Sequence, residues 1–129
     1  MLRWMCKGKI HRATVTESDL NYEGSITLDQ ELMKAANILP YEMVQITNLR
    51  NATLWRTYAI PSPVAGKVGL NGPPAHLFQP GDLIVILSMG IMDQTELTTL
   101  RPSVVMVDGK NQILSVQIKD GLKTECDRS

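Results

Sequence analysis

The sequence predicts a small, mostly β fold of the barrel type with two or three short helices. Short segments rich in β-branched residues recur at close spacing and are separated by turn-forming residues, as in barrels and sandwiches. Helical patterns are rare, so the sequence lacks the strand–helix alternation of a parallel βαβ sheet. At 129 residues the chain has room for one compact domain. We expect this domain at residues 1–118 and a flexible polar tail at residues 119–129.

The first predicted strand, residues 10–16, carries the first candidate functional side chains. Alternation, extended back to the residues just before this strand, places Lys7, Lys9, His11 and Ala13 on one face. The polar residues 17–21 are expected to form a turn. Charged side chains on such a strand also protect an exposed sheet edge from aggregation, so this pattern alone does not separate a functional role from a structural one.

Seven further strands are predicted from β-branched or apolar runs between turn signals. Two of them flank a short loop and form a hairpin, and the two prolines of residues 61–66 end its second strand. Residues 83–89 are apolar on both faces, which predicts a central strand. The predicted strands are residues 25–28, 43–47, 53–60, 68–70, 83–89, 104–107 and 113–118.

Two capping patterns predict the helices. Asp29 is a suitable N-cap for a helix that runs through Ala36. Asp93, with Glu96 three residues later, has the spacing of a capping box for a helix that ends near Leu100.

Net charge and cysteine content exclude several classes of function. The 13 basic and 13 acidic side chains cancel, so no broad positive field attracts nucleic acid or anionic lipid. The two cysteines form neither a disulfide framework nor a metal-ligand spacing, and no segment is apolar for long enough to span a bilayer. We therefore expect a cytoplasmic protein without a metal site and without nucleic acid or a membrane as a partner.

The most unusual local feature is the pair Gly24 and Ser25 between two predicted strands. The simpler interpretation is a turn. The alternative is an N-to-O acyl shift, in which the Ser25 hydroxyl attacks the Gly24 carbonyl. That reaction needs a strained backbone, which glycine permits at the least steric cost. Gly24 suits both interpretations, so the local sequence does not choose between them.

Five blocks of sequence, taken together, favour the acyl shift over a simple turn. They are residues 9–16, 20–29, 57–60, 71–72 and 80–82, and they keep compatible spacings along most of the chain. In this order they resemble the bacterial aspartate 1-decarboxylase family, the pyruvoyl enzymes of pantothenate synthesis. The similarity extends from about residue 1 to residue 114, which makes it far more specific than a lone Gly-Ser pair.

The resemblance implies a double-psi β-barrel assembled as a homotetramer, with active sites between neighbouring subunits. It also implies self-cleavage between Gly24 and Ser25 into residues 1–24 and 25–129. In the family, the ester formed by serine attack eliminates to dehydroalanine, which hydrolyses to a pyruvoyl group at the new N-terminus. The implied cofactor is therefore made from Ser25. Whether a maturation factor assists cleavage stays open.

A pyruvoyl ketone can take the place of a bound cofactor. The substrate amine condenses with it to a Schiff base, which accepts the electrons released when the α-carboxylate departs as CO₂. The implied reaction converts L-aspartate to β-alanine. The family match assigns protonation of the resulting carbanion to Tyr58, whose phenol can donate a proton. Thr57 resembles a threonine that contacts the reacting carbonyl, Lys9 resembles a carboxylate-binding cation, and His11, Tyr22, Asn71 and Gly72 match pocket-lining positions.

The sequence departs from the family pattern at four positions that concern substrate recognition. Leu54 stands where the family usually has an arginine, and Thr47 stands where it often has a tryptophan. Pro73 and Pro74 follow the Asn-Gly pair, and proline has no backbone N–H to donate to a carboxylate.

Arg56 is the candidate that could compensate for the missing arginine. Strand alternation puts it on the same face as Leu54 and Tyr58, about 7 Å from position 54. Three hypotheses stay open: decarboxylation of aspartate in a rearranged pocket, decarboxylation of another small amino acid, and a barrel that serves only as a non-catalytic module. The retained Ser25 and Tyr58 disfavour the third.

Overall fold

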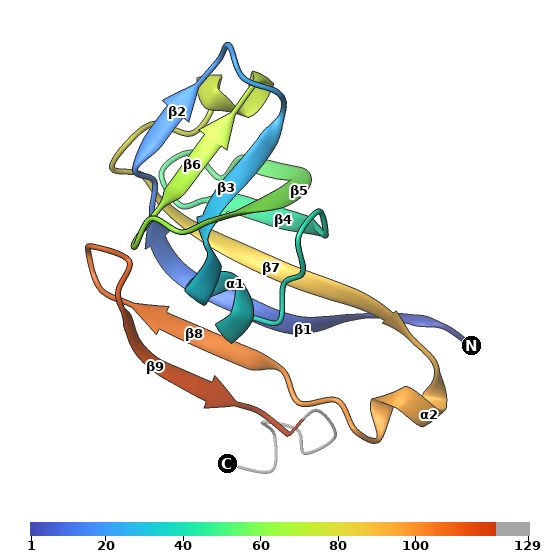
Figure 1. Ribbon diagram of the computed structural model, residues 1–129. Coiled ribbons are helices and arrows are strands. Elements are labelled where there is room, and N and C mark those ends of the chain that lie inside the picture. Colours follow the sequence, from blue (N-terminus) through green and yellow to red (C-terminus); the bar gives the residue numbers. More distant parts are fainter. Residues whose placement is uncertain (121–129) are drawn as a thin grey trace.

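Strands dominate the computed structural model, which describes residues 1–120 (Figure 1). Two α-helices are present in this range, α1 (Gln30–Ala35) and α2 (Gln94–Leu97), and a 3₁₀ helix covers Pro73–His76. The expectation of a mostly β chain with short helices is confirmed. The strands are β1 (Arg3–Thr14), β2 (Glu17–Asp19), β3 (Ser25–Asp29), β4 (Met43–Asn48), β5 (Leu54–Ser62), β6 (Val68–Asn71), β7 (Leu83–Met92), β8 (Ser103–Val107) and β9 (Ile113–Ile118).

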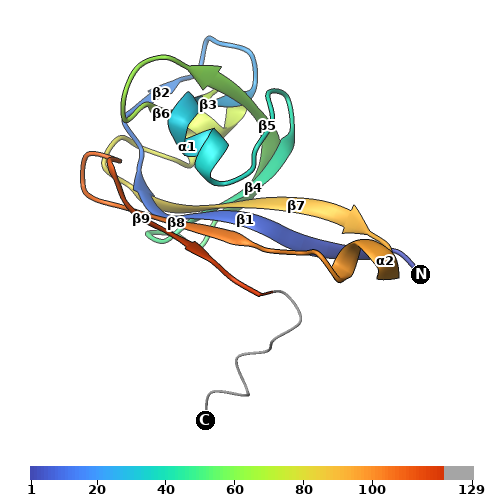
Figure 2. The same cartoon turned by 60° about the horizontal axis from the view of Figure 1, so that its bottom comes forward.

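The strands form one strongly curled sheet in the order β2-β6-β3-β5-β4-β7-β1-β8-β9. Three neighbouring pairs, β1 with β8, β2 with β6 and β3 with β5, are parallel, so the chain crosses between distant strands. Figure 2 looks into the curl, with α1 near its centre. The Thr16 amide donates to the Val68 carbonyl at 2.8 Å, which joins the chain after β1 to β6 and closes the barrel.

Apolar side chains from both halves of the sheet fill the barrel. Leu32 and Met33 on α1 pack onto the same cluster, so the helix covers one end of the core. This arrangement removes the apolar face of the curled sheet from water, which is the main stabilising contribution in a domain of this size. The largest fully buried side chains include Ile10, Ile26, Leu28, Ile46, Val68, Leu70, Phe78, Ile84, Ile86 and Val105.

Both predicted helix caps are confirmed. The Asp29 carboxylate accepts from the Glu31 amide at 2.8 Å and from the Gly66 amide at 2.9 Å, so it also anchors the loop before β6. Asp93 and Glu96 form a complete capping box. The second helix is a single turn that ends at Leu97, before the predicted end near Leu100.

Two predictions on connecting segments are wrong. Residues 17–19 were expected in a turn but form β2, because they pair in parallel with β6 from Glu17 opposite Gly69 onward. Pro61 was expected to end a strand but lies inside β5, opposite Leu28. The pairing of β5 with β4 stops at Tyr58. Pro61 therefore has no partner residue on β4, and its missing N–H removes no hydrogen bond between these two strands.

Strand β1 is longer than predicted and does not alternate regularly. Its pairing with β7 shifts register between Cys6 and Gly8 and again between Ile10 and Ala13. Arg12, with φ of 59°, lies in the second shift, as expected for a bulge that bends the strand. The shift moves Ala13 into the core with Ile10, so the prediction that Ala13 shares a face with His11 is wrong.

A buried carboxylate ties the β4–β5 hairpin to the turn before β7. Asp82, only 8% exposed, accepts hydrogen bonds from the side chains of Asn48 and Arg50 and from the amide of Gln79, at 2.8–3.0 Å. The Arg50 guanidinium, together with these donors, lowers the Asp82 pKa to about 2. The Gly81 amide donates to the Val15 carbonyl at 2.8 Å. The block at residues 80–82 therefore has a structural role.

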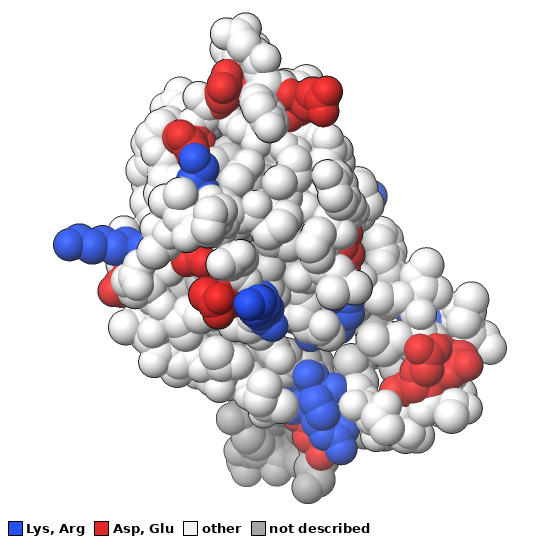
Figure 3. Space-filling model, viewed as in Figure 1, with Lys and Arg blue, Asp and Glu red and all other residues white. Residues whose placement is uncertain are grey.

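The surface carries no dominant sign of charge on the face seen in Figure 3, where acidic and basic side chains are interspersed over a largely uncharged surface. Within residues 1–120 no helix is long and apolar enough to cross a membrane.

Candidate active site

Ser25 occupies a buried position at the start of β3, between β6 and β5. It pairs with Asn71, the last residue of β6, whose side-chain amide donates to the Ser25 Oγ at 3.0 Å and to the Thr27 Oγ1 at 2.9 Å. The Ser25 hydroxyl in turn donates to the Glu23 carbonyl at 3.4 Å. The hydroxyl is therefore directed back along the chain, toward the peptide units that precede it.

The tightest backbone contact of this region is between Gly72 and Gly24. Gly72 has φ of 79°, and a Cβ on it would lie 2.8 Å from the Gly24 Cα and 2.9 Å from the Gly24 nitrogen. It would also approach the Tyr22 carbonyl at 3.2 Å. Both the positive φ and the close approach exclude a larger residue at Gly72.

Gly24 itself is less constrained than the sequence suggested. A Cβ on Gly24 would find Pro73 Cδ at 3.7 Å, an ordinary contact, and its φ is not in the left-handed region. The residue beside the proposed cleavage point that must be glycine is therefore Gly72, which follows β6 and packs against the backbone of Gly24.

Strand β5 brings Thr57 and Tyr58 beside this loop. Because Ile26 pairs in parallel with Ala59, the preceding positions Ser25 and Tyr58 are neighbours on adjacent strands, about 5 Å apart between backbones. Tyr58 is half-buried. Thr57 is buried and lies one position further back, level with Gly24, but its hydroxyl forms no hydrogen bond within residues 1–120.

Lys9 and Arg56 lie on the outward face of the same sheet as Tyr58. The pairings Lys9–Leu87, Leu87–Gln45 and Gln45–Arg56 place these four residues in one row across β1, β7, β4 and β5. Three strand spacings separate Lys9 from Arg56, about 14 Å along the sheet. Since β1 lies between β7 and β8, the alternative that Lys9 and His11 protect an exposed edge is wrong.

The structure does not bring Lys9 to Ser25 within one subunit. Tyr58, which neighbours Ser25, is two residues beyond Arg56 on β5, a further 7 Å or so from the row that contains Lys9. This separation exceeds the reach of a lysine side chain. Residues that the resemblance assigns to one pocket are thus distributed over two distant parts of one outward face.

His11 has a buried ring nitrogen without a partner. Its Nδ1 forms no hydrogen bond among the described residues. Burial lowers the pKa of the imidazole, and the positive charges of Lys9 and Arg12 lower it further. His11 is therefore neutral at pH 7, with one ring nitrogen able to donate a hydrogen bond and the other able to accept one.

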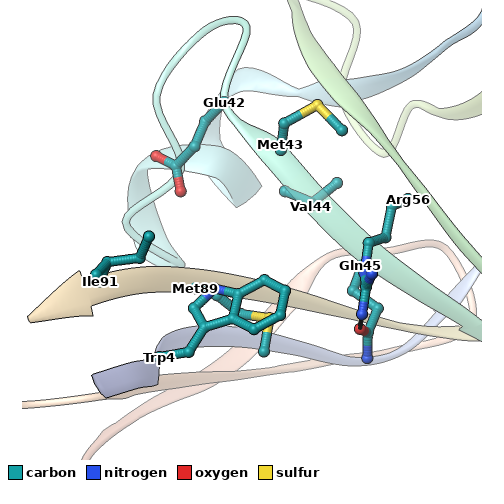
Figure 4. A pocket seen from close by; sticks show the side chains of 8 residues that line it. All are labelled: Trp4, Glu42, Met43, Val44, Gln45, Arg56, Met89 and Ile91. Atoms are coloured by element: carbon teal, nitrogen blue, oxygen red, sulfur yellow. Dashed lines mark hydrogen bonds between the residues drawn. The ribbon is translucent and has the colours of Figure 1, made fainter. Parts of the chain in front are cut away.

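Arg56 borders an open pocket on the outward face (Figure 4). Its guanidinium lies 5.1 Å from the centre of the Trp4 ring, and its Nε and Nη2 donate to the Gln45 Oε1 at 3.4 and 3.3 Å. Glu42 lies on the opposite side of the pocket. Trp4 was not singled out in the sequence, because nothing in its local pattern links it to β5.

The four departures from the family pattern lie in two places in the fold. Leu54 is 51% exposed and pairs with Thr47, so the two departures are neighbours on the outward face. Pro73 and Pro74 open the 3₁₀ helix, a position that needs no amide hydrogen. Tyr22 is exposed on the loop before Ser25. Within residues 1–120 no three His, Cys, Asp or Glu side chains gather as a metal site would require.

The close approach of Gly72 to Gly24 leads to a test of the loop geometry. We expect Gly72→Ala to slow or abolish cleavage between Gly24 and Ser25, because the added Cβ must displace the Gly24 backbone. The fraction of cleaved chain, followed by intact-mass spectrometry, is the measurement. Gly81→Ala is the matched control, since Gly81 also has positive φ (94°) but nothing within 4 Å of its Cβ position. Equal cleavage rates in the two variants would contradict this interpretation.

Comparison with known proteins shows the family of the chain. A family model described as aspartate decarboxylase matches residues 1–114. A protein from Pelotomaculum thermopropionicum, named aspartate 1-decarboxylase, is 57% identical over 118 residues, which are 91% of this chain and 89% of that protein. Proteins of the same name from Moorella thermoacetica and Carboxydothermus hydrogenoformans are 50% and 47% identical, over 91% and 93% of this chain and 92% and 95% of their own lengths. The chain belongs to the aspartate decarboxylase family.

Proposed function

We propose that this protein decarboxylates L-aspartate to β-alanine and CO₂ for pantothenate synthesis, with a pyruvoyl group that it makes from Ser25. The observation that carries the proposal is the buried Ser25 hydroxyl, held by Asn71 and directed toward the peptide units before it, in a chain of this family. The proposal keeps the expectations of a cytoplasmic protein and of a homotetramer.

The proposed cleavage begins with groups that lie together in the structure. The Ser25 oxygen attacks the Gly24 carbonyl carbon, the C–N bond breaks, and the nitrogen takes the hydroxyl proton, which leaves an ester and a free amine. Loss of the Ser25 α-proton and cleavage of the Cβ–O bond then release the Gly24 carboxylate. Hydrolysis of the remaining dehydroalanine releases ammonia and forms the pyruvoyl group. Asn71 orients the attacking oxygen, and Thr57, level with Gly24, is our candidate donor to its carbonyl.

The pyruvoyl group fits this environment, because the Asn71 side-chain amide that donates to the Ser25 Oγ could donate to a carbonyl formed at position 25. When present, it supplies the electron sink for loss of the α-carboxylate. Tyr58, on the adjacent strand, is the proposed general acid that returns a proton to the substrate carbon. His11 and Tyr22 are proposed to line the pocket with Asn71 and Gly72.

The wide separation of Lys9 from Ser25 supports a site shared between subunits. Lys9 lies three strands away from Arg56, at the opposite end of the row across β1, β7, β4 and β5. It cannot reach a substrate held at Ser25 of its own chain. The outward face that carries Lys9 also carries exposed apolar side chains, among them Trp4, Met43 and Leu54, which a second copy would cover. We therefore propose that Lys9 binds the distal substrate carboxylate at the Ser25 site of a neighbouring subunit.

Arg56 is the proposed second cation for that carboxylate. Its long hydrogen bonds to the neutral Gln45 and its contact with Trp4 leave the positive charge without an acidic partner within residues 1–120. A different small amino acid remains the second candidate substrate, and the observation that favours it is the exposed Leu54 at the position where the family usually has an arginine.

The first test of the proposal is the cleavage itself. We expect wild-type protein to separate into residues 1–24 and a larger fragment that lacks a free N-terminal amine, and we expect Ser25→Ala to remain whole and inactive. Intact mass and β-alanine formation are the measurements. Thr27→Ala is the control, because it removes the other oxygen bonded to Asn71 and keeps the nucleophile. Uncleaved wild-type protein after warm incubation would exclude spontaneous processing and would point to a maturation factor.

The second test separates cleavage from turnover. We expect Tyr58→Phe to mature normally but to lose about 10²- to 10⁴-fold in kcat, the usual contribution of a general acid. Maturation is measured by mass, and turnover is measured with L-aspartate. Wild-type kcat in this variant would assign the proton to another group or to water.

The third test concerns the second cation. Loss of one charge-assisted hydrogen bond costs roughly 1.5–3 kcal/mol, or on the order of 10- to 150-fold in affinity. We therefore expect Arg56→Ala to raise KM for aspartate by about this factor without changing cleavage, and Arg56→Lys to recover part of it. Lys34→Ala, which removes an exposed charge on α1, controls for net charge. Unchanged aspartate kinetics would contradict the role, and preference of the wild type for a substrate with one carboxylate would favour the other substrate class.

A further inference from the structure

The turn before β4 holds a bulky aromatic residue in a conformation that suits glycine. The Glu42 amide donates to the Leu39 carbonyl at 3.1 Å, which closes a four-residue turn with Pro40 in second place. Tyr41 in third place has φ of 68°. Proline followed by positive φ is the pattern of a type II turn, whose third residue is usually glycine or asparagine. Tyrosine in this position is an outlier that calls for a reason.

Burial of the Tyr41 side chain does not supply that reason. The residue is 71% exposed, so its ring contributes little to the core. Its ring stacks instead on the ring of Tyr58, with centroids 5.9 Å apart and planes at 20° to each other. The partner of this exposed, strained aromatic is thus the residue proposed as the general acid.

The turn is fastened on both sides of Tyr41. The Tyr41 amide donates to the Ala59 carbonyl at 2.7 Å, and the Ala59 amide donates to the Glu42 carbonyl at 3.0 Å, so the turn is bonded to the residue next to Tyr58. The Glu42 carboxylate accepts from the Leu39 amide at 3.1 Å and the Ser88 hydroxyl at 2.8 Å, and it pairs with Lys7 at 2.7 Å. These bonds hold the backbone in place whatever side chain stands at position 41.

We propose that Tyr41 is a positioning residue for Tyr58, whose ring it holds in the orientation from which the phenol delivers its proton. In that step the Tyr58 O–H bond breaks, a C–H bond forms at the carbon that lost CO₂, and water reprotonates the phenolate. The inference rests on the proposed role of Tyr58. An unsupported phenol on an outward face samples several rotamers, whereas a stacked neighbour restricts it, and such geometry contributes directly to rate.

The test uses a variant in which stability and turnover should move independently. Tyr41→Gly removes the ring and suits the positive φ, so the unfolding midpoint should stay unchanged or rise by a few degrees, and cleavage at Ser25 should be unaffected. An aromatic pair contributes about 2- to 12-fold when its energy is converted to a rate ratio. We expect kcat for aspartate to fall by that factor, KM to stay within about twofold, and the solvent deuterium isotope effect on kcat to increase.

Three further variants make the result specific. Tyr41→Phe keeps the stacking ring and should keep wild-type kcat. Tyr41→Asn provides a second ring-free variant that tolerates positive φ, in case the glycine variant folds poorly. Ala52→Gly is the matched control, because Ala52 also has positive φ (59°) but lies in the hairpin loop before β5 and has no ring to lose.

The possible outcomes separate this inference from the proposed function. Unchanged kcat in Tyr41→Gly and Tyr41→Asn, with Tyr58→Phe strongly impaired, would overturn the role of Tyr41 and leave that of Tyr58 intact. Full activity in Tyr58→Phe would overturn both. Parallel losses of stability and kcat would indicate a merely structural residue, and equal loss in Tyr41→Phe would assign the effect to the hydroxyl rather than to stacking; both would also overturn the proposal.

Discussion

The junction of β6 with the loop before β3 is the contact on which the candidate site depends. Asn71 ends β6 and holds the Ser25 hydroxyl, while the next residue, Gly72, packs its backbone against that of Gly24. The Gly72 amide also donates to the Asp19 carbonyl at 2.7 Å, so β2 is fastened at the same point. The proposed nucleophile and the amide that would orient it are therefore placed by the pairing of the short strands β2, β6 and β3.

The same curled sheet explains why the remaining candidate residues are spread out. Its inward face is filled by aliphatic side chains, so polar groups such as Lys9, Gln45 and Arg56 can project only from the outward face, in a row set by the strand register. A row across four strands is too wide for one small substrate. The proposed association with another copy would cover the apolar side chains of that face and would bring Lys9 toward Ser25 of a neighbour.

Features that depend on local chemistry could be predicted from the sequence, and those that depend on distant pairing could not. The Asp29 cap and the Asp93–Glu96 capping box are short-range patterns, and both were found. The bulge at Arg12 and the strand position of Pro61 depend on which strand lies alongside, which the local pattern does not contain. Among candidate site residues, the motif blocks pointed to Ser25 and Tyr58, which the strand register places next to each other. Trp4 and Tyr41 gave no signal, because each acquires its partner only through the fold.

The two arginines of the β4–β5 hairpin show how the fold separates structural charge from available charge. Arg50 forms two hydrogen bonds of 2.8 and 3.0 Å to a carboxylate that is nearly buried, so removing it would leave Asp82 without its counter-charge. Arg56 instead has two long bonds to one neutral oxygen and a ring at 5.1 Å. Such contacts orient a guanidinium but hold it less strongly than a carboxylate does. An incoming carboxylate can therefore compete for Arg56 more readily than for Arg50, and this difference supports the proposal that Arg56 binds the substrate carboxylate.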